Sequence, residues 1–71
     1  MTKAERRDDI GNRHSLVMAE RNAFTQRGSD DYKKLSELLK AISSEYENGN
    51  KERHIMHFFG GKYGYTTEAI S

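Results

Sequence analysis

The first residues in this chain whose spacing could do chemistry are two histidines, His54 and His57, which lie three positions apart. On a helix this spacing turns both imidazoles to one side, where they could ligate zinc together with Glu52 or His14. A structural zinc normally takes four ligands, and the spacing fixes no third one. We therefore predict no metal site and no cofactor, and interpret the pair as half-exposed surface histidines.

A second pattern, Gly60-Gly61-Lys62, invites comparison with a phosphate-binding loop. Such a loop follows a buried strand and has a Ser or Thr directly after the lysine, whereas Tyr63 follows here. We therefore reject a phosphate site. The glycines let the chain turn, and Tyr63 and Tyr65 then either pack back on the protein or contact a partner.

Three arginines near the N-terminus, Arg6, Arg7 and Arg13, form a basic group that could contact the phosphates of a nucleic acid. Asp8 and Asp9 lie among them, and the net charge of the whole chain is only +1. Nucleic-acid-binding domains are usually far more basic. Nucleic-acid binding is therefore the alternative, and a solvated helix face that pairs its own charges is the preferred interpretation.

Catalysis needs a nucleophile, a base and a group that orients the base, and no spacing in this sequence implies such a set. A chain of 71 residues is also too short to enclose a pocket of the size that enzymes use. We therefore predict that the protein is not an enzyme.

The length and composition of the chain limit the size of its core and the number of its domains. The 71 residues suffice for one domain, 1–71, and contain neither cysteine nor proline. Leu, Ile, Val and Phe together number only 12, which is few for a self-sufficient core, so we expect either a marginally stable monomer or help from association. No apolar run approaches the roughly 20 residues that span a bilayer, and no signal-type stretch opens the chain. We expect a soluble, cytoplasmic protein with no membrane partner.

The clearest predicted element is a helix over residues 30–47. Its apolar positions are spaced by 3, 4, 3 and 4 residues, so they share one face. These positions are Tyr32, Leu35, Leu39, Ile42 and Tyr46, with Leu38 beside them. Ser29 is a suitable N-cap, and Asn48-Gly49 provides a C-terminal stop.

A longer helix is predicted over residues 2–27. Thr2 and Glu5 match a capping box at its start, and residues 11–12 could break it. Its apolar positions recur every seven residues, at Ile10, Val17 and Phe24. Gly28 suits its C-terminal end, and the short connection that follows favours an antiparallel helical hairpin whose seam joins the two apolar faces.

The remaining residues predict a third helix over 51–59, which a cap at Asn50 would begin, and an irregular tail over 60–71. Ile55, Phe58 and Phe59 would share one face of this helix. The tail shows the period-2 alternation of a strand, but a lone strand would have nothing to pair with. The predicted fold class is therefore all-α: an antiparallel helical hairpin, a short third helix and a Gly/Tyr tail.

The predicted function is that of a small non-enzymatic protein-interaction module that binds and modulates a larger protein, as accessory, inhibitor and adaptor proteins do, including those of phages and mobile elements. Buried aromatic residues commonly dominate protein interfaces. The predicted partner-binding residues are Phe58, Phe59, Lys62, Tyr63 and Tyr65, with Arg53 adding charge at the rim. The alternatives are nucleic-acid binding through Arg6, Arg7 and Arg13, and a structural homodimer that forms a four-helix bundle.

Overall fold

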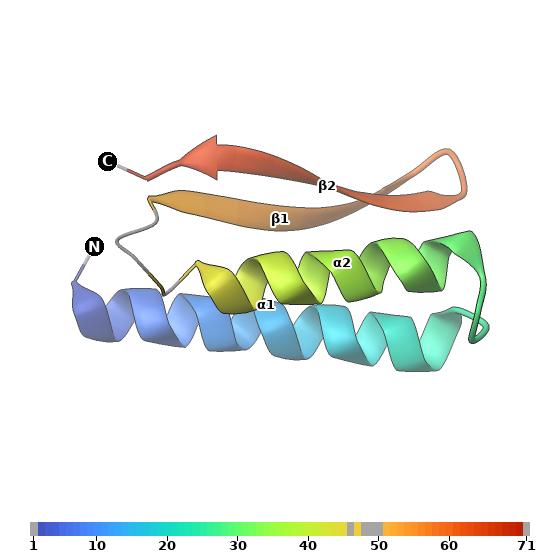
Figure 1. Cartoon of the computed structure of the whole chain (residues 1–71), viewed down its shortest axis with the longest axis horizontal. Helices are drawn as coiled ribbons and strands as arrows, with labels where there is room; N and C mark the ends of the chain where they lie inside the picture. Colours follow the sequence, from blue (N-terminus) through green and yellow to red (C-terminus); the bar gives the residue numbers. More distant parts are fainter. Residues whose placement is uncertain (1, 46, 48–50, 71) are drawn as a thin grey trace.

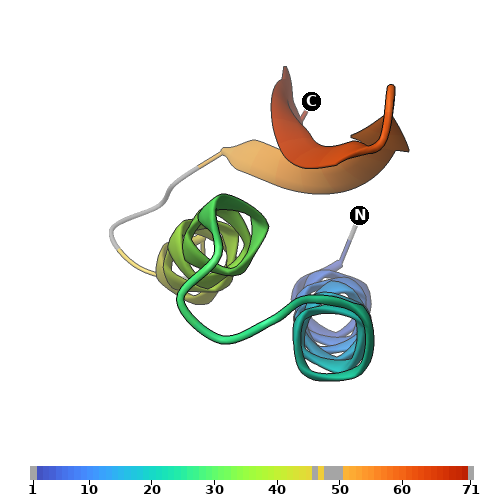
Figure 2. The same cartoon turned by 90° about the vertical axis from the view of Figure 1, so that its right-hand side faces the viewer.

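The computed structural model describes residues 2–45, 47 and 51–70, and it shows an α+β protein in which a helical hairpin carries a β-hairpin (Figure 1). The elements are α1 (Lys3–Phe24), α2 (Asp30–Ser44), β1 (Glu52–Phe59) and β2 (Lys62–Ala69). Figure 2 shows the two helices side by side, with the β-hairpin lying over them as a second layer.

Both helices begin at side-chain caps. The hydroxyl of Thr2 accepts a hydrogen bond from the backbone N–H of Glu5, and the hydroxyl of Ser29 accepts one from the N–H of Tyr32. Each bond satisfies one of the N–H groups that a helix start leaves without a partner. α1 is continuous through residues 11–12, so the break considered there does not occur.

The prediction of an all-α fold is wrong, because residues expected to form a third helix and a tail are the two strands. β1 and β2 pair antiparallel, from Phe59 opposite Lys62 to Glu52 opposite Ala69. The two residues between them, Gly60-Gly61, have φ angles of +63° and +79°. Two successive left-handed residues make the tight turn whose twist matches a β-hairpin, and glycine adopts them without strain. Each strand thus supplies the partner that the other one needs.

The core lies where α1, α2 and the β-hairpin meet. Its buried side chains are Val17, Leu35, Leu38, Leu39 and Ile42, and Ile10, Met56 and Tyr63 pack against them. Phe24, which was expected in this seam, is 71% exposed. It occupies the last turn of α1, beside the start of α2, whose first buried side chain comes only at Leu35. Three predicted features lie outside the described residues: Tyr46 in the seam, the stop at Asn48-Gly49 and the cap at Asn50.

Candidate functional site

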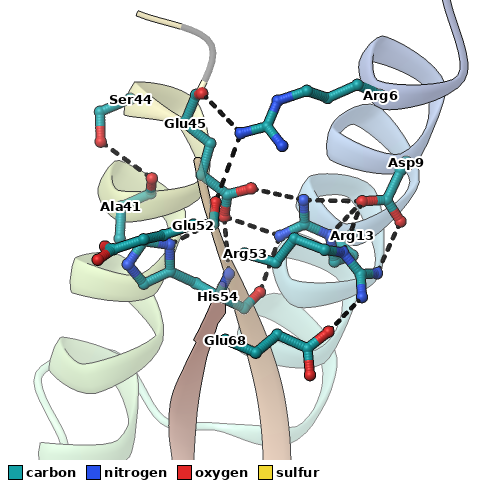
Figure 3. Close-up of polar contacts among 10 residues, drawn as sticks. All are labelled: Arg6, Asp9, Arg13, Ala41, Ser44, Glu45, Glu52, Arg53, His54 and Glu68. Carbon is teal, nitrogen blue, oxygen red and sulfur yellow. Dashed lines mark hydrogen bonds and ion pairs between the residues drawn. The ribbon is translucent and has the colours of Figure 1, made fainter. Parts of the chain in front are cut away.

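A set of charged side chains joins the two helices to the β-hairpin near the end of α2 (Figure 3). We call it the charged cluster, and its members are Asp9, Arg13, Glu45, Arg53, His54 and Glu68. The Arg13 guanidinium lies 3.0 Å from the Asp9 carboxylate and 2.6 Å from that of Glu45. The Arg53 guanidinium lies 2.8 Å from Asp9 and 2.8 Å from Glu68. Cations and anions therefore alternate from α2, through α1, to both strands.

Glu45 is the buried centre of the charged cluster, and its side chain is 0% exposed. Its two carboxylate oxygens accept hydrogen bonds from Arg13 at 2.6 and 2.8 Å. The backbone N–H of His54 donates to one of these oxygens at 2.8 Å, and the ring Nδ1 of His54 lies 2.9 Å from it. A buried carboxylate is tolerated only when it is paired and hydrogen-bonded in this way.

The two helical carboxylates of the charged cluster are held in their ionised form. Hydrogen bonds from Arg53 outweigh partial burial, and with Arg13 they lower the pKa of Asp9 below its ordinary 3.8. Burial alone would raise the pKa of Glu45, but the hydrogen bonds from Arg13 and His54 win, so this pKa lies below 4.5. Both shifts mean that the ionised carboxylates of Asp9 and Glu45 are more favourable in the folded protein than in the unfolded chain.

The free energy of unfolding should therefore fall in acid. The contribution of Asp9 and Glu45 is complete well above pH 4.5, where both are fully ionised even in the unfolded chain, and is lost as the pH falls through their lowered native pKa values. Urea midpoints measured from pH 7 to pH 3 should stay level and then drop. Asp9→Asn should flatten this drop, whereas the exposed neighbour change Asp8→Asn should leave it steep. A midpoint that holds constant down to pH 3 would contradict the assignment.

The charged cluster also occupies the backbone edge of β1. At His54 the N–H donates to Glu45 and the C=O accepts from Arg13 at 2.9 Å. Arg6 donates to the C=O of Glu45 at 3.0 Å and lies 3.5 Å from the C=O of Glu52. Side chains of both helices thus take the place of a neighbouring strand, and they fix where β1 lies on the helices.

The C-terminal end of α1 and the turn of the β-hairpin lie at the same end of the molecule, away from the C-terminal end of α2 (Figure 1). Phe24, Phe58 and Phe59 are 71%, 60% and 85% exposed. We call these three residues the aromatic end. The ring of Phe58 lies 4.6 Å from that of Tyr63, whose hydroxyl donates to the Glu20 carboxylate of α1 at 3.0 Å. Burial, and after it this hydrogen bond, raise the pKa of Tyr63. Phe58 is therefore supported by a ring that is itself tied to α1.

The structure divides the five predicted partner-binding residues. Phe58, Phe59 and Lys62 surround the exposed turn of the β-hairpin. Tyr63 packs against the core, and the ring of Tyr65 lies farther along β2, 5.7 Å from that of His54. Arg53, expected at the rim, is engaged by Asp9 and Glu68. Phe24 completes the exposed set and was assigned to the core by its seven-residue spacing.

The three arginines considered for nucleic-acid contacts do not form an open basic face. Arg6 and Arg13 share one side of α1, as their spacing indicates, but this side faces the β-hairpin. Arg13 is only 12% exposed and contacts Asp9 and Glu45. Arg7 lies on the exposed surface of α1. The guanidinium groups of Arg6 and Arg13 thus donate their hydrogen bonds within the protein.

The two histidines considered for zinc do not share a face. They lie on β1, where residues three positions apart point to opposite sides of the sheet. Across the described ranges 2–45, 47 and 51–70, no group of three or more His, Asp and Glu side chains is placed to hold a metal ion. Among the helices that the structure describes, none is long and apolar enough to cross a membrane.

The surface of the described residues has hollows, of which two bear on the sites above. One, of about 470 Å³, lies between α1 and α2 and is lined by Met18, Leu39, Arg21 and Lys40 among others. The other, of about 560 Å³, lies at the start of α2 beside the hairpin turn, where acids and lysines alternate. Both are open to solvent, unlike the enclosed clefts that bury most of the surface of a small ligand.

Comparisons with protein-family models, with curated proteins and with solved structures find no match to this chain. Function therefore has to be inferred from two local features of the molecule, the charged cluster and the aromatic end. The charged cluster satisfies its own charges, whereas the aromatic end is open to solvent.

Proposed function

We propose that this protein is a non-enzymatic interaction module that binds a larger protein through the aromatic end and modulates it. The observation that supports the proposal is the exposure of Phe24, Phe58 and Phe59, at 71%, 60% and 85%, in a chain that has no other phenylalanine. Phenylalanine is normally among the more buried residue types. Placing all three at one end of the fold, outside the core, suits a surface that a partner covers.

The scaffold beneath the aromatic end is suited to binding because it is already organised. The two-glycine turn fixes the end of the β-hairpin, and Tyr63 holds the ring of Phe58 while bonded to Glu20. Contacts made by side chains that are held before binding lose less conformational entropy on association. Lys62, which pairs with Phe59 and is exposed, would supply positive charge at the rim. The partner that fits is an apolar groove with acidic residues at its border.

The two other predicted functions receive less support. Nucleic-acid binding would need Arg6 and Arg13 to leave their contacts with Glu45. A four-helix bundle would need the apolar face of α2, but the β-hairpin packs there through Met56 and Tyr63. A protein partner at the aromatic end requires neither rearrangement.

The proposal is tested by placing a photo-crosslinking phenylalanine analogue at position 59 and irradiating cells that naturally contain the protein. We expect one adduct of higher mass, because the Phe59 ring would sit in the partner. The same analogue at exposed Lys33, on α2, is the matched control and should give no adduct. Phe59→Asp should fold normally, since surface changes usually alter stability by less than about 0.5 kcal/mol. Added in excess, this variant should no longer reduce the yield of the position-59 adduct, because it no longer binds the partner. Equal adducts from positions 59 and 33, or none from position 59, would overturn the proposal.

A further inference from the structure

The β-hairpin alternates between residues whose backbone bonds the neighbouring strand and residues whose backbone points away from it. The N–H of Ile70 donates to the C=O of Lys51 at 2.7 Å, which sets the phase of this alternation. With the observed register, residues 53, 55, 57 and 59 bond β2, and residues 52, 54, 56 and 58 point outward. The backbone bonds of His54 to Glu45 and Arg13 confirm this phase, because they leave from the outer edge.

The outer edge of β1 faces the helices, and side chains of the helices cover it at Glu52 and His54. On β2 the outward groups belong to residues 63, 65, 67 and 69. The first is covered as well, since the N–H of Tyr63 lies 3.4 Å from the Asp31 carboxylate of α2. What remains on β2 is a row of three outward residues: Tyr65, Thr67 and Ala69.

This row is unprotected. Within the part of the chain that the structure describes, no backbone hydrogen bond is found for the outward groups of Tyr65, Thr67 and Ala69. All three residues are exposed, and Figure 1 shows β2 as the outermost strand here, with β1 between it and the helices. Proteins usually guard such edges with lysine, proline, a bulge or a covering element. Residues 63–69 contain neither lysine nor proline, and their pairing with β1 has no bulge.

We propose that β2 pairs with β2 of a second copy of this chain, antiparallel and centred on Thr67, to give a four-stranded sheet in the order β1-β2-β2-β1. A two-fold axis at Thr67 sets Thr67 opposite its own copy and Tyr65 opposite Ala69 of the other chain. Each outward N–H and C=O of these residues then meets a complementary group, as an antiparallel ladder requires.

The side chains agree with this register. Tyr65 of one copy would lie opposite Ala69 of the other, so a ring covers a small residue. Glu68 would lie opposite Thr66 of the other copy rather than opposite the second Glu68. A register centred on Tyr65 would instead pair Tyr63, whose N–H already faces Asp31. We favour a second copy as the partner because β2 is complementary to itself in this register, so no other strand is needed. The contact is small, so we expect a weak dimer that dissociates on dilution.

Amide hydrogen exchange tests the proposal residue by residue. In concentrated protein the amides of Tyr65, Thr67 and Ala69 should exchange several-fold more slowly than in dilute protein, because dimers protect them. The amides of Thr66 and Glu68, which bond β1, should be protected equally at both concentrations. Sedimentation should report a dimer whose population falls on dilution. An unchanged exchange rate at Tyr65 and Thr67 together with a monomer at every concentration would overturn the proposal.

A matched pair of variants separates the edge from the fold. Thr67→Pro removes the outward N–H but none of the bonds to β1, so the chain should fold and stay monomeric. Thr67→Val keeps this N–H and should dimerise as the parent does. If Thr67→Pro fails to fold, the exchange pattern of the parent protein still decides. Dimerisation undiminished in folded Thr67→Pro would refute this register. Phe59→Asp should not affect the dimer, so this inference and the proposed function fail independently.

Discussion

Replacing Glu45 with alanine should destabilise the protein by about 3–5 kcal/mol, the usual effect of removing one partner from a buried ion pair. The substitution leaves the Arg13 guanidinium, 12% exposed, without its main anion and leaves the N–H of His54 without an acceptor. Small domains have only roughly 5–15 kcal/mol in total. Urea titration followed by circular dichroism should show a midpoint far below that of the parent, or no folded baseline at all.

Two comparisons make the Glu45 result specific. Glu47→Ala removes an exposed acid two positions away and should leave the midpoint almost unchanged. The double change Arg13→Met with Glu45→Leu removes both buried charges and should recover much of the loss, because an apolar pair can replace a buried ion pair. If Glu45→Ala and Glu47→Ala had the same small effect, the charged cluster would not stabilise the fold.

Leu38→Ala should cost about 2–5 kcal/mol, because it leaves a cavity in a packed core. The Leu38 side chain is 0% exposed and lies among Leu35, Ile42 and Val17. Thermal unfolding should show a marked fall in midpoint. Leu16→Ala deletes the same atoms from a residue that is 54% exposed and serves as the control, with an expected loss well below that of Leu38→Ala. Equal losses at the two leucines would mean that α2 packs differently from the structure.

The helices could be predicted from the sequence because their signals are local. Ser29 as a cap and the 3, 4, 3 spacing from Tyr32 to Ile42 each need only one turn of neighbouring residues to be interpreted. The strands could not be predicted in the same way. Residues 52–59 fit a helix and a strand comparably well, and the period-2 alternation of β2 predicts a stable strand only if residues 52–59 are a strand that pairs with it. Two glycines between two ring-rich segments were the available hairpin signal.

The candidate site was predicted only in part, for a related reason. Helix geometry places Arg6 and Arg13 on one side, but no local pattern says whether that side faces water or another element. The acid that decides it, Glu45, lies 32 residues from Arg13. One signal was present: Glu45 follows Ile42 by three and Leu38 by seven residues, so it belongs to the apolar face of α2. An acid at such a position indicates a buried partner of opposite charge.

The ion pairs of the charged cluster have a consequence for the uniqueness of the native state. If β1 shifted by two residues along the helices, the same face of the strand would still point inward. Apolar contacts alone would therefore discriminate poorly between the two arrangements. The shift would, however, take Arg53 away from Asp9 and bring a different backbone N–H to Glu45. We infer that these polar contacts exclude mispacked conformers. The double variant Arg13→Met with Glu45→Leu should then melt at a high midpoint while showing duplicated amide resonances; a single sharp set would argue against this role.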